Sequence, residues 1–219
     1  MNSTIRRATE NDKDFLITSI IEAEKSGAGI ISYCAIFSIT EDVFRGVLSN
    51  MLDEDVEGQE LCISNFLIFE IDGERAAAVS AWVEGAGGIP SNIIKSNLLM
   101  SFIDRQVLLN AAPALGLMNE INIARTGNAL QIECVYTAAK FRGMGLSGRL
   151  INEHIRLQQN EGMPIDKVQV ILLKNNSSAV KAYEKAGFSV TTEKKCSDKA
   201  IFNLLPGDTK VLMERKLKA

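Results

Sequence analysis

The sequence has a single histidine and four cysteines, so the residues from which most protein metal sites are built are scarce. The cysteines lie far apart and form no Cys-x-x-Cys pair; they are Cys34, Cys62, Cys134 and Cys196. This spacing excludes the usual zinc motifs, and in a chain of 219 residues it argues against a disulfide framework. We therefore expect no metal site, and free thiols in a reducing, cytoplasmic environment.

An excess of charge of either sign is also missing. The 24 Lys and Arg residues and 27 Asp and Glu residues give a net charge of −3, with no polybasic run. A nucleic-acid partner therefore has no electrostatic support. No stretch of about 18 apolar residues occurs, and the first residues lack the apolar segment of a signal peptide. These absences predict a cytoplasmic protein without a membrane partner.

What the chain does contain is typical of a globular protein. Hydrophobic residues make up 46 % of the sequence and charged residues 23 %, which argues against disorder. No repeat, low-complexity segment or linker divides the chain. We predict a single domain over residues 1–219.

Hydrophobic periodicity and turn residues predict a mixture of strands and helices. The expected strands are residues 4–9, 62–71, 75–84, 130–137, 167–173, 188–193 and 210–217. The expected helices are residues 10–27, 40–54, the segment after residue 145, and 177–186, while residues 28–37 are apolar and ambiguous. Asn11 is expected to cap the first helix and Gly27 to end it, and Asp72-Gly73 has the sequence of a hairpin turn.

Residues 84–129 separate the third and fourth expected strands with a long, mostly helical block. Its apolar residues keep a helical period up to Ala112, and we expect Pro113 to interrupt the helix. Insertions of this length are usually functional or interfacial. We expect this one either to cover a binding site or to make a homodimer contact.

Residues 140–150, "KFRGMGLSGRL", contain a G-x-G-x-x-G at Gly143, Gly145 and Gly148. A dinucleotide-binding turn is disfavoured, because five residues separate the strand from Gly143 and no acidic residue ends the next strand. A Walker A loop is excluded because Gly-Lys-Ser/Thr is absent. The remaining interpretation is a glycine loop at a helix N-terminus, whose backbone N–H groups and dipole bind a pyrophosphate.

A second motif follows in "LKNNSSAVKAYEKAGFSV", which starts at Leu173. It resembles the second signature of the GNAT superfamily of acyl-CoA-dependent N-acyltransferases, roughly N-x-x-A-x-x-x-Y-E-K-x-G-F. The matching residues are Asn176, Ala179, Tyr183, Glu184, Lys185, Gly187 and Phe188. The family's first signature, Q/R-x-x-G-x-G/A, matches at Arg142 and Gly145, with Ser147 at the last position. The resemblance is firm over residues 130–190 and absent over 84–129.

This resemblance implies an α/β (α+β) fold with a mixed, mostly antiparallel central sheet. Helices would cover both faces, and the helical insertion would lie between strands 3 and 4. It also implies acetyl-CoA as the co-substrate, no metal, and a transferase reaction. In that reaction an acetyl group passes to a primary amine by direct attack in a ternary complex.

The resemblance also assigns roles to particular residues. Backbone N–H groups near Val135 and Tyr136 would bind the carbonyl oxygen, with Thr137 in the same cofactor-binding stretch. Tyr183 would be the general acid for the CoA sulfur, and Asn176 would contact the pantetheine arm. The pyrophosphate would be held by Arg142, Gly143, Met144, Gly145, Leu146, Ser147 and Gly148.

The general base is left open by the sequence. Strand alternation puts Glu133, Val135 and Thr137 on one face, and Cys134 on the opposite face as a core residue. Glu133 resembles the position from which some family members draw a base, yet a solvated or ion-paired carboxylate explains it equally well. A covalent route through Cys134 is disfavoured.

No pattern specific to one acceptor is visible. The leading hypothesis is acetylation of a small-molecule amine. A protein or peptide N-acetyltransferase is one alternative, which a covered site disfavours. A non-catalytic acyl-CoA-binding sensor is the other, which the presence of Tyr183 disfavours.

Overall fold

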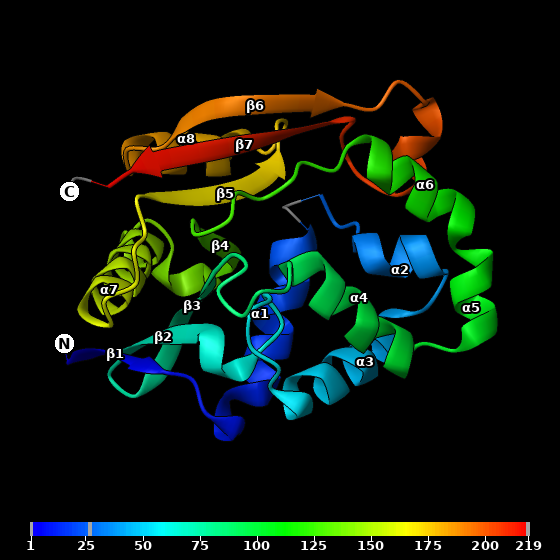
Figure 1. Cartoon of the computed structure of the whole chain (residues 1–219). Coiled ribbons are helices and arrows are strands. Elements are labelled where there is room, and N and C mark those ends of the chain that lie inside the picture. Colours follow the sequence, from blue (N-terminus) through cyan, green and yellow to red (C-terminus); the bar gives the residue numbers. More distant parts are fainter. Residues whose placement is uncertain (1, 26–27, 218–219) are drawn as a thin grey trace.

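The computed structural model describes residues 2–25 and 28–217, so Gly27, the expected end of the first helix, lies outside the described residues. The described residues form one seven-stranded sheet in the order β1-β2-β3-β4-β5-β7-β6 (Figure 1). Among them only β4 and β5 pair in parallel. The strands are β1 (Ser3–Arg7), β2 (Phe66–Ile71), β3 (Glu74–Val83), β4 (Leu130–Thr137), β5 (Lys167–Leu173), β6 (Ser189–Lys195) and β7 (Thr209–Lys216). This mixed, mostly antiparallel sheet confirms the expected fold class.

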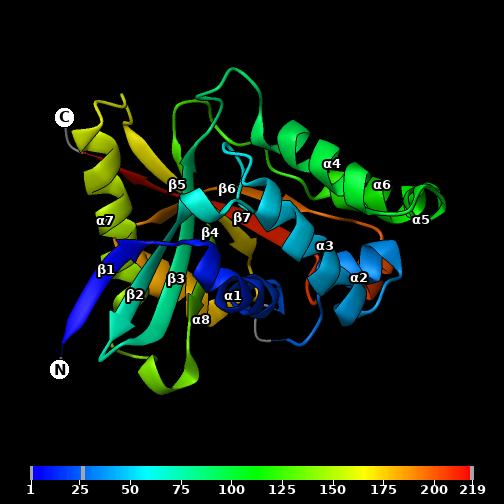
Figure 2. The same cartoon turned by 90° about the horizontal axis from the view of Figure 1, so that it is seen from below.

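Helices cover both faces of the sheet, and each face has its own hydrophobic core (Figures 1 and 2). One core contains residues of α1 (Lys13–Lys25), α2 (Ser32–Phe37) and α3 (Glu41–Glu54). The other contains residues of α7 (Leu146–Asn160) and α8 (Ser177–Lys185). The structure therefore resolves residues 28–37, which were ambiguous in sequence, as containing the short helix α2.

The β2–β3 hairpin shows how the sequence sets the two faces. Asp72 and Gly73 both have positive φ angles, 49° and 82°, as a two-residue type I′ turn requires. Alternate residues of β2 then enter opposite cores, so that Leu67 and Phe69 face α7 while Ile68 faces α1. The predicted hairpin is confirmed.

The start of α1 differs from the expectation. Asn11 is not its cap; instead the Thr9 N–H donates to Asp12 Oδ2 at 2.9 Å, in one turn of 3-10 helix before α1. The buried Asp12 carboxylate also accepts hydrogen bonds from Arg6 (2.7 Å) and Arg75 (2.5 Å). The Arg6 hydrogen bond is the main reason that the pKa of Asp12 lies well below its usual range. These contacts attach the start of α1 to β1 and β3.

The insertion between β3 and β4 forms three helices. They are α4 (Ser91–Phe102), α5 (Arg105–Asn110) and α6 (Ala112–Glu120). The expected interruption at Pro113 is present, because α5 ends at Asn110 and Pro113 lies in the first turn of α6, where its missing N–H costs no helical hydrogen bond. A second break, which was not expected, lies at Asp104, whose side chain caps α5 by accepting a hydrogen bond from the Gln106 N–H at 2.7 Å.

The insertion is not detached from the rest of the protein. Its residues Leu99, Ile103, Ala111 and Ile121 belong to the same core as α1 and α3. Figure 2 shows α4, α5 and α6 in an arc beside α2 and α3. The arc therefore forms a wall at one end of the sheet.

Helix α8 is capped at both ends. At the start, the Asn176 side chain accepts a hydrogen bond from the Ala179 N–H at 3.3 Å. At the end, Gly187 has a φ of 87°, and the Phe188 N–H donates to the Tyr183 carbonyl at 3.0 Å. This is the pattern of a Schellman motif, in which glycine supplies the left-handed residue.

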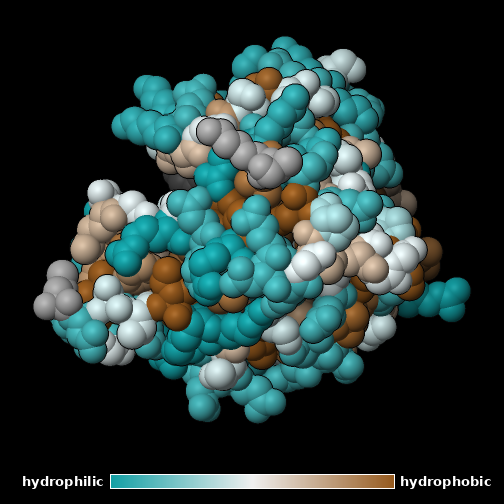
Figure 3. Space-filling model, turned by 60° about the vertical axis from the view of Figure 1, so that its left-hand side comes forward, coloured by the Kyte–Doolittle hydropathy of each residue, from teal (hydrophilic) through white to brown (hydrophobic). Residues whose placement is uncertain are grey.

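The molecular surface is mostly hydrophilic on the face shown in Figure 3, which also has a notch in its outline. In the part of the chain that the structure describes, no helix combines the length and apolar character needed to cross a membrane.

Candidate active site

The site is built around a split between the two parallel strands. Strands β4 and β5 pair only over Leu130–Ile132 and Val168–Val170. Beyond Ile132, β4 continues along β3 and β5 continues along β7, and no further β4–β5 pair is made within the described chain. The facing edges of the two strands are therefore open to a ligand that can pair with their backbone groups.

A β-bulge in β4 lies beside the split. Cys134 and Val135 together oppose Val79 of β3, and Cys134 has a left-handed φ of 51°. A non-glycine residue in this region costs about 1–2 kcal/mol, and such strain is concentrated at functional sites. The bulge thus marks the point at which β4 leaves its regular path.

The bulge corrects one sequence expectation. Val135 packs with the core on the α7 face, whereas Cys134 packs with the core on the α1 face. The strict alternation that put Val135 on the same face as Glu133 is therefore wrong, because an extra residue in the bulge reverses the faces. Burial raises the pKa of Cys134 well above its usual value, so its thiol stays protonated and is a poor nucleophile.

The glycine loop leads from β4 into α7. Gly143 and Gly145 have φ angles of 82° and 71°, and Gly145 is the residue that caps α7. Because α7 begins at Leu146, the N–H groups of its first turn have no acceptor inside the helix and carry its positive dipole end. Gly148 is not in the left-handed region, so only two of the three glycines need to be glycine for their backbone conformation.

A cavity of about 530 Å³ extends from this split. The residues of the two motifs that line it are Val135, Ser147, Gly148, Asn176, Ala179 and Tyr183. The insertion contributes Lys95, Leu99, Leu115, Met118 and Arg125, and the N-terminal helices contribute Glu24, Ser32 and Tyr33. One cavity therefore connects the two sequence motifs to the inner side of the insertion.

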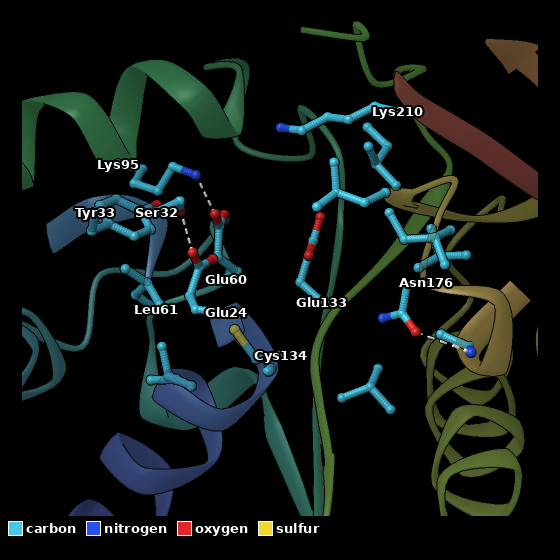
Figure 4. Close-up of a pocket in the computed structure, with 18 of the residues that line it drawn as sticks. Glu24, Ser32, Tyr33, Glu60, Leu61, Lys95, Glu133, Cys134, Asn176 and Lys210 are labelled. Carbon is cyan, nitrogen blue, oxygen red and sulfur yellow. Dashed lines mark hydrogen bonds and ion pairs between the residues drawn. The ribbon is translucent and has the colours of Figure 1, made fainter. Parts of the chain in front are cut away.

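Tyr183 and Asn176 form part of the wall next to the split. The Tyr183 side chain is buried and packs edge-on against Phe188, with ring centroids 5.5 Å apart. Burial and the nearby Glu133 and Cys134 raise the pKa of Tyr183, so the phenol keeps its proton at neutral pH. In Figure 4 Asn176 lies on the α8 side of the cavity, across from Glu133.

Glu133 is brought into the cavity together with Arg125 of the insertion. Arg125 Nη2 lies 2.6 Å from Glu133 Oε1, and the Arg125 guanidinium stacks over the Trp82 ring at 5.1 Å. Burial raises the pKa of Glu133, and the Arg125 charge opposes that rise. Sequence analysis left an ion-paired Glu133 open, and the structure shows that pair.

The far end of the cavity contains more charged residues (Figure 4). Lys95 of α4 makes an ion pair with Glu60, and the Ser32 hydroxyl donates a hydrogen bond to Glu24 of α1. Burial raises the pKa of Glu24. Lys210 at the start of β7 lines the same space.

Sequence reasoning missed these charged residues. They are Glu24, Glu60, Lys95, Arg125 and Lys210. Only Lys95 gave a local signal, as a lone cation in the apolar run "NIIKSNLLM" of the insertion. The others sit in ordinary amphipathic or loop contexts and meet only through the fold.

The proposed pyrophosphate-binding residues differ in their exposure. Arg142 and Met144 are exposed, and Arg142 Nε donates to the Thr137 carbonyl at 3.3 Å. Leu146 is buried in the core under α7, so that it can take part in anion binding only through its backbone. Tyr136 turns its ring away from the split, to pack edge-on against Phe15 of α1.

The described residues contain no group of three or more His, Cys, Asp and Glu side chains that could hold a metal ion. His154 is buried in α7 with Nε2 3.0 Å from the Val79 carbonyl, and burial lowers its pKa to about 4. His154 is therefore a packed residue of the apolar face of α7.

The part of the chain that forms the split and the glycine loop is similar to a known protein family. Residues 106–203, which include β4, the glycine loop and α8, match the model of the "Acetyltransferase (GNAT) domain". This stretch, just under half of the chain, resembles a GNAT acetyltransferase domain. The match confirms the resemblance of the two motifs to this family and supports an acyl-CoA-dependent acetyltransferase. No curated protein matches the sequence.

Solved structures share the fold of this protein along almost the whole chain. An N-acetyltransferase from Staphylococcus aureus Mu50 has a TM-score of 0.66 at 13% identity, covering 96% of this chain and 99% of its own. A structure described as an acetyltransferase has a TM-score of 0.62 at 17% identity, with coverage of 98% and 100%. The ribosomal-protein-S18-alanine N-acetyltransferase from Escherichia coli has a TM-score of 0.53 at 11% identity, with coverage of 100% and 96%. At these identities the likeness concerns the fold and leaves the acceptor undetermined.

The geometry of the site itself fits an acyl-CoA. The loop N–H groups at the start of α7 could hold the pyrophosphate, and the open strand edges could pair with the pantetheine amides. The cavity beyond them has room for the acyl group beside Tyr183.

The loop geometry predicts a specific effect of Gly145→Ala. A Cβ at this position meets no atom within 4 Å but forces alanine to a φ of 71°. We expect a loss of stability of about 1 kcal/mol, and acetyl-CoA affinity reduced by about tenfold because the loop N–H groups shift. Isothermal titration with acetyl-CoA and thermal unfolding measure the two effects.

Gly162→Ala is the matched control. Gly162 lies just beyond the other end of α7, with a φ of 73° and equally open space. It should lose similar stability and retain acetyl-CoA affinity. Equal affinities for both variants would contradict the assignment of the loop.

Proposed function

We propose that the protein transfers the acetyl group of acetyl-CoA to a primary amine of a small molecule, by direct attack in a ternary complex. The observation that carries this proposal is that one cavity joins the β4–β5 split to a charged region beneath the insertion. We call this region the chamber; its charged lining residues are Glu24, Glu60, Lys95, Arg125, Glu133 and Lys210. One part of the cavity suits an acyl-CoA and the other suits a polar acceptor. Both substrates can then be bound at once.

The insertion supports a small acceptor over a polypeptide. Helices α4 and α6 line the chamber through Lys95, Leu99, Leu115 and Met118, and α2 closes it from another side. In Figure 1 these helices stand together at one end of the sheet. The insertion thus acts as a cover of the acceptor site, where an extended peptide would have little room.

The chain offers the groups that acetyl transfer needs. As the amine nitrogen bonds to the thioester carbon and the carbon–sulfur bond breaks, the nitrogen loses one proton and the sulfur gains one. Backbone N–H groups at Val135 and Tyr136, where β4 no longer pairs with β5, can stabilise the charge on the carbonyl oxygen. Tyr183, which keeps its proton at neutral pH, can supply the proton to the sulfur.

Glu133 is the proposed general base. It lines the cavity next to the split, and burial raises its pKa toward the range in which a carboxylate can accept a proton effectively. The ion pair with Arg125 fixes the position of the Glu133 side chain and favours its ionised form. Thr137, at the end of β4, would complete the cofactor-binding stretch through its backbone.

The whole proposal is tested by measuring CoA thiol release from acetyl-CoA with a panel of small primary amines, beside thermal shifts with acetyl-CoA. We expect stabilisation by acetyl-CoA and thiol release with at least one amine. Stabilisation without release on amines or peptides would favour a sensor, and release with peptides alone would favour a peptide acetyltransferase. No stabilisation by CoA or acetyl-CoA would overturn the assignment.

Tyr183→Phe isolates the general acid. The substitution keeps the ring packing on Phe188 and removes only the hydroxyl, so acetyl-CoA affinity should change by less than about twofold. Loss of general acid assistance should lower kcat by about 10²–10⁴. Steady-state kinetics and titration with acetyl-CoA measure both, and a fully active variant would remove Tyr183 from the mechanism.

Glu133→Gln tests the base through pH dependence. A base must be deprotonated, so wild-type kcat should fall as the pH is lowered through the raised pKa of Glu133, above the usual value of about 4.3. The variant should lose this acidic limb and about 10²–10³ in kcat. The measurement is kcat at saturating substrates from pH 5 to pH 9.

Glu24→Gln is the comparison for this experiment, because it removes another buried carboxylate from the same chamber. It should change KM for the acceptor more than kcat and should retain the acidic limb. If Glu24→Gln loses the limb and Glu133→Gln keeps it, the base is misassigned.

A further inference from the structure

Lys210 differs from the other cations of the acceptor chamber. Lys95 pairs with Glu60 and Arg125 pairs with Glu133, but no described residue receives a hydrogen bond or ion pair from the Lys210 ammonium. Its side chain lines the cavity, and Figure 4 shows it reaching into the space beyond Glu133, opposite Lys95.

An unpaired ammonium in this place is costly. Burial disfavours its charged form and lowers the pKa of Lys210, while Glu24 and Glu133 attract the charge from a greater distance. A buried charge is usually paired, because its desolvation is unfavourable when no partner compensates for it. The ammonium is therefore placed to gain from an anion that enters the cavity.

Other charged side chains of the chamber are paired only in part. The Ser32 hydroxyl, which is uncharged, is the hydrogen-bond donor to Glu24. Glu60 Oε2 is buried and has no hydrogen-bond partner among the described atoms, and the same holds for Arg125 Nε. Two residues that line the cavity therefore each have an unsatisfied buried atom: Glu60 has a free hydrogen-bond acceptor and Arg125 has a free donor.

The charges of the chamber are balanced. It contains three carboxylates, Glu24, Glu60 and Glu133, and three cations, Lys95, Arg125 and Lys210. A polycationic acceptor would need an excess of carboxylates, which this set does not provide. A molecule that carries one positive and one negative group would match both the balance and the unpaired groups.

We infer that the acceptor is a small amino acid or similar zwitterion, whose carboxylate is bound by Lys210 while its amine faces the carboxylates of the chamber. This inference rests on the proposed function and specifies its substrate class. Lys210 would then be a specificity-determining residue, which selects amines that carry a carboxylate. Lys210 would take no part in acetyl transfer itself, for which Tyr183 and Glu133 are the proposed acid and base.

The test compares each of a set of L-amino acids with the amine that its decarboxylation gives. Thiol release from acetyl-CoA is measured with wild type, Lys210→Met and Lys216→Met. Methionine keeps most of the length of the side chain and removes the charge. Lys216 lies on the same strand, β7, and is exposed at its other end, so its variant is the matched control.

Wild type and Lys216→Met should have kcat/KM at least about tenfold higher for one or more amino acids than for the matching amine. Lys210→Met should lose this preference through a rise of KM for the amino acid, again by about tenfold or more, with acetyl-CoA affinity unchanged. Lys210→Arg, which keeps the charge, should restore part of the preference.

Each other outcome overturns the inference in a recognisable way. Equal use of amino acids and amines by wild type would refute the substrate class and leave the proposed function intact. A loss of kcat for both kinds of acceptor in Lys210→Met, at constant KM, would show that Lys210 serves the chemistry and does not select the substrate. Absence of thiol release with every amine would remove the proposed function itself, and the inference with it.

Discussion

The divergence of β4 from β5 is the feature on which the rest of the site depends. Parallel pairing ends at Ile132 and Val170, and the bulge at Cys134 lies directly after it. Because the two strands separate there, their backbone edges open, a cavity forms between them, and α8 can place Tyr183 on its wall. The strain of a left-handed Cys134 is tolerated because β3 pairs with β4 on both sides of the bulge.

The cavity has two parts of different origin. The part next to the split comes from two nearby segments, the glycine loop and the start of α8, which are about 30 residues apart in sequence. The chamber comes from α1, the loop before β2, the insertion and β7, which span most of the chain. The first part supports binding of an acyl-CoA. In the proposed function, the second part selects the acceptor.

Much of the fold could be predicted because its signals are local. The turn residues Asp72 and Gly73, the cap at Asn176 and the left-handed Gly187 act within a few residues, and the hairpin expected at Asp72-Gly73 was confirmed. The errors arose where a distant contact changed a local pattern. The bulge at Cys134 reversed the face of Val135, and the contacts of Arg6 and Arg75 with Asp12 fix the start of the first helix, where Asn11 was expected as the cap. Periodicity does not contain either effect.

The sequence by itself determined the glycine loop and the capped helix that carries Tyr183, and hence the resemblance to the GNAT family. Each of these depends on backbone conformations that a short stretch of residues selects. The tertiary structure alone decided that Arg125 meets Glu133, that Lys95 meets Glu60, and that Lys210 faces them without a partner. Charged residues that are far apart in sequence follow no periodic pattern, so their pairing is set only when the sheet and the insertion bring their backbones together.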